Sequence, residues 1–82
     1  MTILKTSLWF FAGTSDKLYI ATLTGSQHGV YTLTAQWGRR GKTLQSQTKG
    51  IYYSEWEARR EFHKLVGSKA RKGYQVTDEV VA

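Results

Sequence analysis

The sequence predicts an α+β fold, in which a small antiparallel β-sheet of four to five strands has one α-helix packed across one face. Short segments rich in aromatic and β-branched residues recur early in the chain, and turns containing glycine separate them at intervals of about 8–12 residues. After residue 54 the spacing of apolar residues changes to that of a helix. A chain of 82 residues is also expected to form one domain.

Four strands are expected before the helix and a short one after it. The four cover residues 3–12, 17–24, 30–37 and 43–52. Residues 74–76 can add the final short strand. The domain is therefore expected to span residues 1–77, and residues 78–82 are expected to form a loose tail.

The helix has recognisable start and stop signals. Ser54 and Glu57 form a capping box, and Gly73 suits the position just after the helix. Five side chains between these signals fall on one helical stripe, namely Ala58, Phe62, Leu65, Val66 and Lys69. Gly67 is unusual because glycine inside a helix costs about 1 kcal/mol relative to alanine.

Aromatic residues are expected to supply much of the core of so small a domain. Six of them are expected mostly to pack in the core or on the sheet, namely Trp9, Tyr19, Tyr31, Tyr52, Tyr53 and Trp56. Tyr74 is expected to be more open, since it follows the helix cap close to several basic residues.

The net charge of +6 is concentrated in the middle of the chain. Residues 1–38 carry two lysines and one aspartate, whereas residues 39–72 carry ten basic and three acidic side chains. The last ten residues carry two acidic side chains and no basic one. This distribution indicates an anionic partner, with nucleic acid first and an acidic protein or an anionic membrane second.

Several function classes are disfavoured by the composition. The chain has no cysteine and only two histidines, His28 and His63, so neither a metal site nor a cofactor is expected. It contains no motif for acyl or phosphoryl transfer, so an enzyme is not expected. No segment approaches the roughly 20 apolar residues of a membrane span, and the expected location is the cytoplasm. The edge strands are polar enough for a monomer.

Residues 37–42, Trp-Gly-Arg-Arg-Gly-Lys, are the strongest functional signal. An indole beside guanidinium groups suits binding to base faces and phosphates, and the two glycines allow backbone N–H groups to approach an anion. Lys49 on the next strand can extend this basic patch. The alternative is structural: Trp37 packs at the sheet edge with Arg39 stacked on it, and the basic loop is simply solvated.

Several short motifs in a fixed order connect this signal to a known family. They are Lys17-Leu18-Tyr19, Trp37-Gly38-Arg39-x-Gly41-Lys42, Gln45, Glu57-Ala58-x-x-x-Phe62 and Lys69-x-x-x-Gly73-Tyr74. In this order and spacing the chain resembles a WGR domain over about residues 3–76. WGR domains occur in some poly(ADP-ribose) polymerases, where they bind DNA at strand breaks, and in bacterial proteins, sometimes nearly alone.

The resemblance implies a binding module without the polymerase, because no segment resembles that catalytic domain. It also implies that Trp37 packs on a terminal sugar or base and that Arg39 grips backbone phosphate. Two residues depart from the pattern of the polymerases. Arg40 replaces a usually aliphatic residue and adds charge, and Leu44 replaces a second glycine and can change the path of the loop.

The first hypothesis is a DNA-binding module that contacts the phosphate backbone, and strand ends among its targets, with little base-sequence specificity. The residues expected to bind are Trp37, Arg39, Arg40, Lys42, Lys49 and Tyr74. Two alternatives stay open at this point. One is a protein–protein interaction adaptor that docks an acidic partner, and the other is RNA binding.

Overall fold

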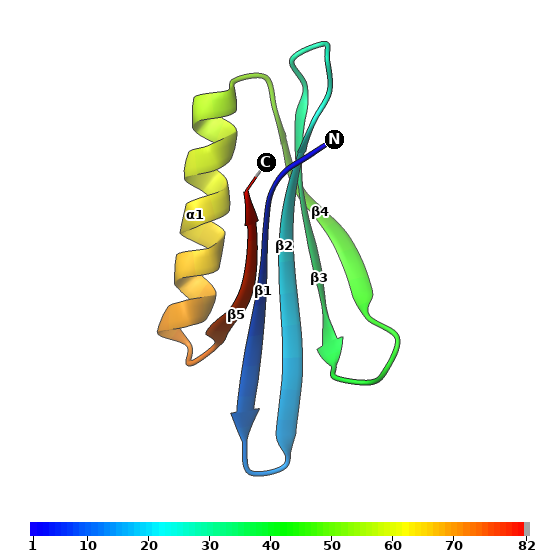
Figure 1. Ribbon diagram of the computed structural model, residues 1–82, viewed down its shortest axis with the longest axis vertical. Helices are drawn as coiled ribbons and strands as arrows, with labels where there is room; N and C mark the ends of the chain where they lie inside the picture. Colours follow the sequence, from blue (N-terminus) through cyan, green and yellow to red (C-terminus); the bar gives the residue numbers. More distant parts are fainter. Residues whose placement is uncertain (82) are drawn as a thin grey trace.

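A computed structural model describes residues 1–81 and confirms the α+β fold. The elements are β1 (Thr2–Ala12), β2 (Ser15–Gly25), β3 (Tyr31–Arg39), β4 (Gln45–Tyr52), α1 (Glu55–Arg71) and β5 (Gln75–Val81). The strands form one antiparallel sheet in the order β4-β3-β2-β1-β5, and α1 lies across one face of it (Figure 1).

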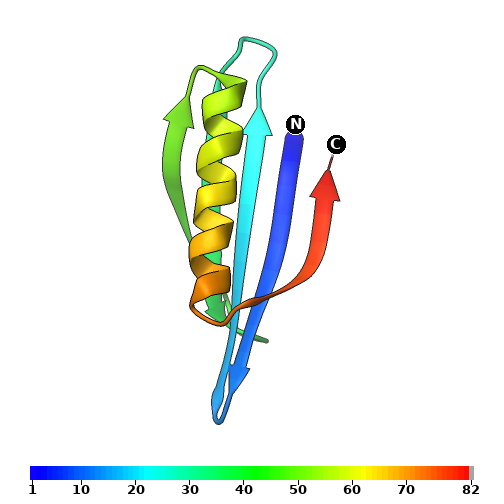
Figure 2. The same ribbon diagram turned by 90° about the vertical axis from the view of Figure 1, so that its left-hand side faces the viewer.

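The first four strands form a meander of consecutive antiparallel neighbours. The tight turn between β1 and β2 pairs Ala12 with Ser15 and contains Gly13 at φ 59°, a conformation that glycine adopts without steric cost. This hairpin extends beyond the end of the helix, so its tip is not covered by α1 (Figures 1 and 2). The face of the hairpin tip that points away from α1 is therefore open to contacts with the loop that follows β3.

Two groups of buried side chains form the core between α1 and the sheet. The larger group contains Leu23, Leu33 and Phe62, and the smaller one is built from Leu8, Tyr19 and Ala35. Two residues of the expected helical stripe, at positions 65 and 66, pack against both groups. Figure 2 shows the helix lying over the middle of the sheet. The predicted stripe is thus confirmed as the face that α1 buries.

The start of α1 is confirmed by its cap. Ser54 has an extended backbone, and its hydroxyl accepts a hydrogen bond from the N–H of Glu57 at 3.3 Å. This bond satisfies one of the backbone donors that every helix leaves unpaired at its first turn.

In the described chain, residues 1–81, no helix is long and apolar enough to span a membrane.

The end of the chain differs from the predicted loose tail at residues 78–82. Residues 78–81 are part of β5, which pairs with β1 and places Val80 opposite Lys5 and Glu79 opposite Thr6. All residues of β5 are exposed, so the strand has no alternating apolar pattern to reveal it. Backbone pairing to the free edge of β1 forms it instead. Ala82 lies outside the described residues.

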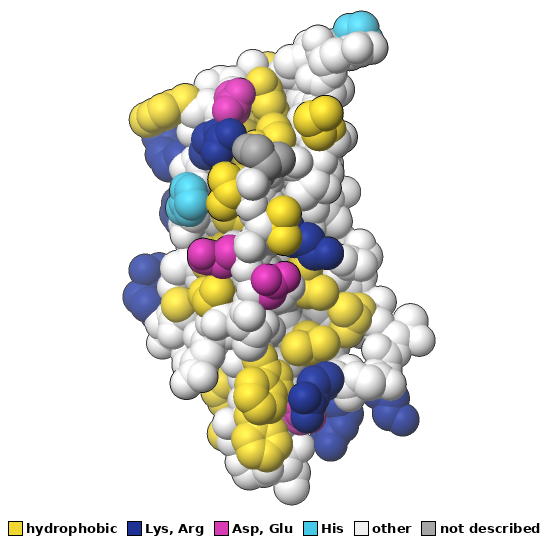
Figure 3. Space-filling model, in the orientation of Figure 1, with side chains coloured by type: hydrophobic (Ala, Val, Ile, Leu, Met, Phe, Trp, Pro, Cys, Tyr) yellow, Lys and Arg dark blue, Asp and Glu magenta, His cyan; other side chains and the backbone are white. Residues whose placement is uncertain are grey.

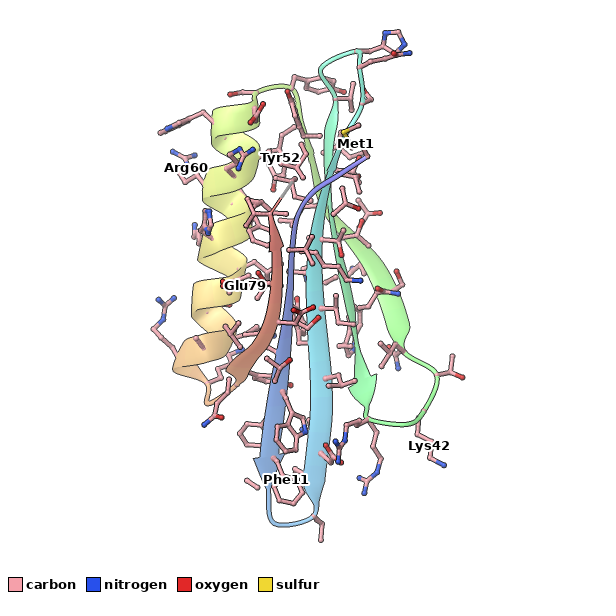
Figure 4. All side chains as sticks on the ribbon, viewed as in Figure 1. Met1, Phe11, Lys42, Tyr52, Arg60 and Glu79 are labelled. Atoms are coloured by element: carbon pink, nitrogen blue, oxygen red, sulfur yellow. The ribbon has the colours of Figure 1, made fainter. Side chains whose placement is uncertain are left out.

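Two aromatic side chains expected to pack are exposed. Tyr53 is 79% exposed and Trp56 is 69% exposed. Both lie near the start of α1, where the chain passes from the sheet to the helix. The guanidinium of Arg60 lies 4.8 Å from the centroid of the Trp56 ring, a cation–π contact that partly covers the indole. Figure 4 shows Arg60 pointing away from the sheet.

Candidate nucleic-acid interface

Trp37 lies near the end of β3, on the face of the sheet that carries the helix. Tyr19 on β2 is its direct partner across the strands, and the two rings stack with centroids 6.5 Å apart at 23°. Tyr19 is buried, whereas Trp37 is only half-buried. Tyr19 thus fixes the position of an indole that still reaches the surface. Trp37 therefore packs on the sheet and still keeps part of its ring accessible.

Tyr74 is brought to the same place by the end of the helix. Gly73, at φ 102°, donates its N–H to the Ala70 carbonyl, and the N–H of Tyr74 bonds to the Lys69 carbonyl at 3.2 Å. These are the two hydrogen bonds of a Schellman motif, which reverses the chain. The Tyr74 ring then meets Tyr19 edge-on, with centroids 6.2 Å apart.

Lys69 completes this aromatic cluster of Tyr19, Trp37 and Tyr74. Its ammonium lies 4.6 Å from the centroid of the Tyr19 ring, in a cation–π contact. Burial raises the pKa of Tyr19, and the nearby Tyr74 adds to that shift. Burial also lowers the pKa of Lys69, and the positive charges of Lys72 and Lys49 lower it further. Positive charge is therefore concentrated around the aromatic cluster.

Two hollows flank the aromatic cluster. The first, here the lysine hollow, has a volume of about 170 Å³ and is lined by Tyr19, Trp37, Gln47, Lys49, Lys69 and Tyr74. The second, here the arginine hollow, has a volume of about 310 Å³ and is lined by Lys17, Trp37, Gly38, Arg39 and Tyr74. Trp37 and Tyr74 line both hollows and so form the wall between them.

The arginine hollow brings the predicted residues Trp37, Arg39 and Tyr74 together with Lys17, which was not predicted. Arg39, the last residue of β3, is exposed and stands opposite Lys17 of β2. Lys17 was not expected at the site, although its position two residues before Tyr19 puts both side chains on one face of a strand. That alternation was a usable signal. Lys69 was likewise expected only to cover the sheet, not to line a hollow.

Lys49 takes its expected place, on the strand after the motif. A register shift between β3 and β4 leaves Lys49 between the pairs Leu33–Gly50 and Thr34–Thr48. Its ammonium donates to the side-chain oxygen of Gln47 at 3.4 Å, and both side chains line the lysine hollow. The bulge thus directs Lys49 toward the helix-side face, where Trp37 lies.

Arg40 lies on the opposite face of the sheet from Arg39. Its Nε is 3.1 Å from Oδ2 of Asp16, and its guanidinium lies 5.1 Å from the centroid of the Trp9 ring. The indole N–H of Trp9 donates to the other oxygen of Asp16. Trp9 also stacks on Phe11, with centroids 5.5 Å apart. We call Trp9, Phe11, Asp16 and Arg40 the hairpin-tip cluster.

The hairpin-tip cluster satisfies its own charges. The hydrogen bond from Trp9 holds the pKa of Asp16 below its ordinary value, and the hydrogen bond and charge of Arg40 lower it further. Phe11 remains 61% exposed at the tip. Figure 3 shows hydrophobic side chains gathered at this lower end of the molecule beside basic ones. The structure therefore separates Arg40 from the aromatic cluster.

Lys42 sits on the exposed loop that follows β3, away from both hollows (Figure 4). Its N–H bonds to the Arg39 carbonyl at 3.1 Å, and Gly41 takes φ 85°. The unusual Leu44 folds over Gly38, where an added Cβ would lie 3.2 Å from a methyl group of Leu44. Gly38 thus leaves room for the leucine, and the loop carries Lys42 into solvent.

A comparison with protein families places the chain. The model of the WGR domain family matches residues 7–81, nearly the whole sequence. The chain belongs to the WGR domain family. This family is a binding module of the nucleic-acid-binding type found in proteins like the poly(ADP-ribose) polymerases.

Two further comparisons and one search add little to the family assignment. No curated protein and no solved structure matches this WGR domain. Among residues 1–81, no group of three or more histidine, aspartate or glutamate side chains is arranged to hold a metal ion.

Proposed function

We propose that this WGR domain binds DNA through its phosphate backbone, with the two hollows as the contact site and little reading of base sequence. The observation that carries the proposal is the half-buried Trp37 between two hollows lined by Lys17, Arg39, Lys49 and Lys69. Within the described chain, no acidic side chain lines either hollow. An indole and phosphate-binding cations side by side suit a nucleic-acid backbone and a base or sugar face.

The pairing of charges elsewhere supports this choice of face. Within residues 1–81, the ion pairs involve Arg40, Arg59 and Arg60, which bond to Asp16, Glu55 and Glu61. The cations that line the two hollows are not among them. Their field is therefore available to an anionic partner, and neutralising several phosphates would release counterions and favour binding.

The finer part of the proposal is that Trp37 packs against the last sugar or base of a DNA end. An indole fixed from one side by Tyr19 is a rigid platform, and a terminal nucleotide offers a face that an internal one keeps stacked. Internal stretches of duplex would then be held by the cations alone. Binding to ends should consequently be tighter than binding to closed DNA.

The test measures fluorescence anisotropy of the purified domain with three labelled DNAs of equal length: a blunt duplex, a 5′-phosphorylated duplex and a closed dumbbell without ends. Tighter binding to the open duplexes than to the dumbbell would support the end-binding proposal. Equal and steeply salt-dependent binding would leave a general backbone binder. No binding at low salt would reject DNA binding and favour the adaptor that docks an acidic protein.

One additional pair of probes distinguishes RNA binding from DNA binding. Matched DNA and RNA hairpins compete for the same labelled duplex, so that only the sugar differs between them. Preference for the RNA hairpin would overturn the choice of DNA, because the 2′-hydroxyl would then contribute to recognition. Trp56→Ala serves as the matched protein control, since Trp56 is exposed but lines neither hollow.

A further inference from the structure

A third hollow continues the first two along the helix. It has a volume of about 280 Å³ and is lined by Leu33, Lys49, Tyr52, Glu61, Lys64, Leu65 and Ser68. It shares Lys49 with the lysine hollow, which in turn shares Trp37 and Tyr74 with the arginine hollow. Because neighbouring hollows share lining residues, the three form a row that runs from α1 and β4 to the ends of β2 and β3, and we call this row the helix–β4 groove.

The length of the groove follows from the strand beneath it. Arg39 marks one end and Leu33 lies beneath the other, so the groove runs along about 20 Å of β3 at about 3.4 Å per residue. Figure 4 shows Tyr52 at the upper end, between α1 and the sheet, and the loop of Lys42 at the lower end. At the stacked spacing of about 3.4 Å this distance holds at most about six nucleotides, and it holds fewer when the bases unstack.

Cations occur along the whole groove. Lys17 and Arg39 lie at the lower end, Lys69 and Lys49 in the middle and Lys64 toward the upper end. The single acidic residue of the described lining is Glu61, and its carboxylate lies 3.5 Å from Nε of Arg60, which offsets its charge. A polyanion such as a nucleic-acid strand would meet positive side chains along the whole groove.

Aromatic rings alternate with these cations. Trp37 and Tyr74 stand between the lower two hollows, and Tyr52 lines the upper one. Rings at both ends of the groove offer stacking surfaces to bases, while the cations between them can follow the backbone. An acidic peptide would use the charges but would leave these rings without a matching partner. The lining therefore favours nucleic acid over protein.

The position of the rings also favours unpaired bases. Tyr52 lines a hollow between α1 and the sheet, where a base turned out of its stack can reach it. In a duplex the flat faces of the bases are covered by their neighbours, and extruding a base costs a few kcal/mol. A single strand has its bases already free to turn toward the protein.

We propose that the helix–β4 groove binds a single-stranded overhang of about four to six nucleotides that continues from a DNA end held at Trp37. This inference rests on the proposed function, because it takes the duplex end at Trp37 as the starting point of the overhang. It adds the kind of end that the domain prefers and the path of the strand. Lys64 and Tyr52 become binding residues in addition to those around Trp37.

The electrostatics of the middle of the groove agree with this path. The charges of Lys72 and Lys49 add to burial in lowering the pKa of Lys69. A phosphate placed between Lys69 and Lys49 would remove that repulsion and bond to both ammonium groups. Bound anion and ammonium charges would therefore stabilise each other in the lysine hollow.

The test uses DNA hairpins with one open end, either blunt or extended by overhangs of increasing length on the 5′ or the 3′ strand. Anisotropy gives the affinity of the domain for each. We expect affinity to rise with overhang length by about fivefold or more, the lower limit of one base–aromatic stack, and to level off near six nucleotides. An abasic overhang of equal length should lose most of that gain.

Lys64→Glu is the diagnostic variant, because Lys64 is exposed and lines only the upper hollow. It should remove the overhang gain while leaving blunt-end affinity much less affected. Arg71→Glu is its matched control, since it makes the same charge change on α1 at a residue outside all three hollows. Equal losses in the two variants would overturn the proposed path.

Other outcomes separate this inference from the function on which it rests. Blunt-end binding without any overhang gain would overturn the groove as a single-strand site and leave the proposed function intact. Failure to bind any of the hairpins would overturn both. An abasic overhang that keeps the full gain, or an acidic peptide that displaces the overhang as well as single-stranded DNA does, would overturn base stacking in the groove.

Discussion

Two tryptophans near the same end of the sheet have opposite surroundings. Trp37 stands with Arg39 on the helix side, in hollows whose described lining has no acidic residue. Trp9 stands on the other face with Arg40, and both contact the carboxylate of Asp16. Similar side chains thus make an open cationic site on one face and an internally paired cluster on the other. The presence of a carboxylate decides between the two.

The comparison also shows how two adjacent arginines can have different tasks. Side chains of consecutive residues on a strand point to opposite faces of the sheet. Arg39, the last residue of β3, therefore shares a face with Trp37, while Arg40, the first residue after the strand, turns toward Asp16. Residue type alone predicts a phosphate contact for both arginines. The neighbours of each side chain argue that only Arg39 contributes its full charge to a ligand.

The largest expected effect contrasts the two tryptophans. Trp37→Ala should weaken binding to a blunt duplex by about 1–3 kcal/mol, the range for loss of one aromatic stacking partner. Trp9→Ala should leave the affinity nearly unchanged, because Trp9 lies on the far face. Anisotropy measures both affinities, and thermal unfolding checks that both variants fold. Equal weakening would show that the two faces do not differ in function.

The second contrast concerns the two arginines and salt. If about four phosphates are contacted, the logarithm of the binding constant should fall with the logarithm of the salt concentration at a slope of about −3.6. Arg39→Ala should flatten this slope by about one unit, since one phosphate contact is lost. Lys42→Ala should flatten the slope by about one unit as well, because its exposed ammonium is expected to contact a second phosphate. Arg40→Ala should change the slope little, because Asp16 already compensates its charge.

Measuring Kd at several salt concentrations decides this prediction. A slope that is unchanged in both Arg39→Ala and Lys42→Ala would remove these residues from the site. A slope flattened by Arg40→Ala as much as by Arg39→Ala would show that the contact with Asp16 opens when DNA binds.

A smaller effect separates stability from binding. An added Cβ at Gly67 would find only the Arg71 guanidinium at 3.8 Å, which is an ordinary contact, so no crowding requires glycine there. Gly67→Ala should therefore stabilise the domain by about 1 kcal/mol, because alanine favours the helix. Chemical denaturation measures the free energy of unfolding. Affinity for DNA should stay unchanged, and destabilisation would mean that α1 needs a glycine for packing.

The smallest expected effect is the pH dependence of the hairpin-tip cluster. Hydrogen bonds from Trp9 and Arg40 hold the pKa of Asp16 below its ordinary value of 3.8, so the folded state favours the charged carboxylate. The stabilisation is present above about pH 4 and is lost as pH falls through the lowered pKa. The effect is small because ion pairs open to solvent are screened.

Thermal unfolding at several pH values tests this, with Asp16→Asn as the reference. The unfolding midpoint of the natural sequence should exceed that of the variant near neutral pH, and the difference should shrink in acid. A difference that stays constant below pH 4 would contradict a charged Asp16 in the cluster. Asp16→Asn also removes the carboxylate partner of Arg40 and should add positive charge on the face of the sheet away from α1. The affinity of this variant for DNA is therefore measured as well.

Much of the fold could be predicted because its signals are local. The strand alternation, the cap at Ser54 and the glycine at position 73 each depend on residues within one turn or strand, and the structure confirms them. Trp37, Tyr74 and Arg39 also lie together, as the motif order suggested. The final strand was predicted only over residues 74–76, and its extension to Val81 was missed because pairing with β1, rather than burial, forms it.

The sequence by itself determined the elements, the helix face, the family and the basic character of the middle of the chain. Only the tertiary structure decided which cations share a face with Trp37. Lys17 and Lys69 joined it through strand register and helix packing, while Arg40 was drawn to Asp16, far away in sequence. The physical reason is that periodicity is written in neighbouring residues, whereas the electrostatic surroundings of a side chain depend on strands and helices that meet only in the folded protein.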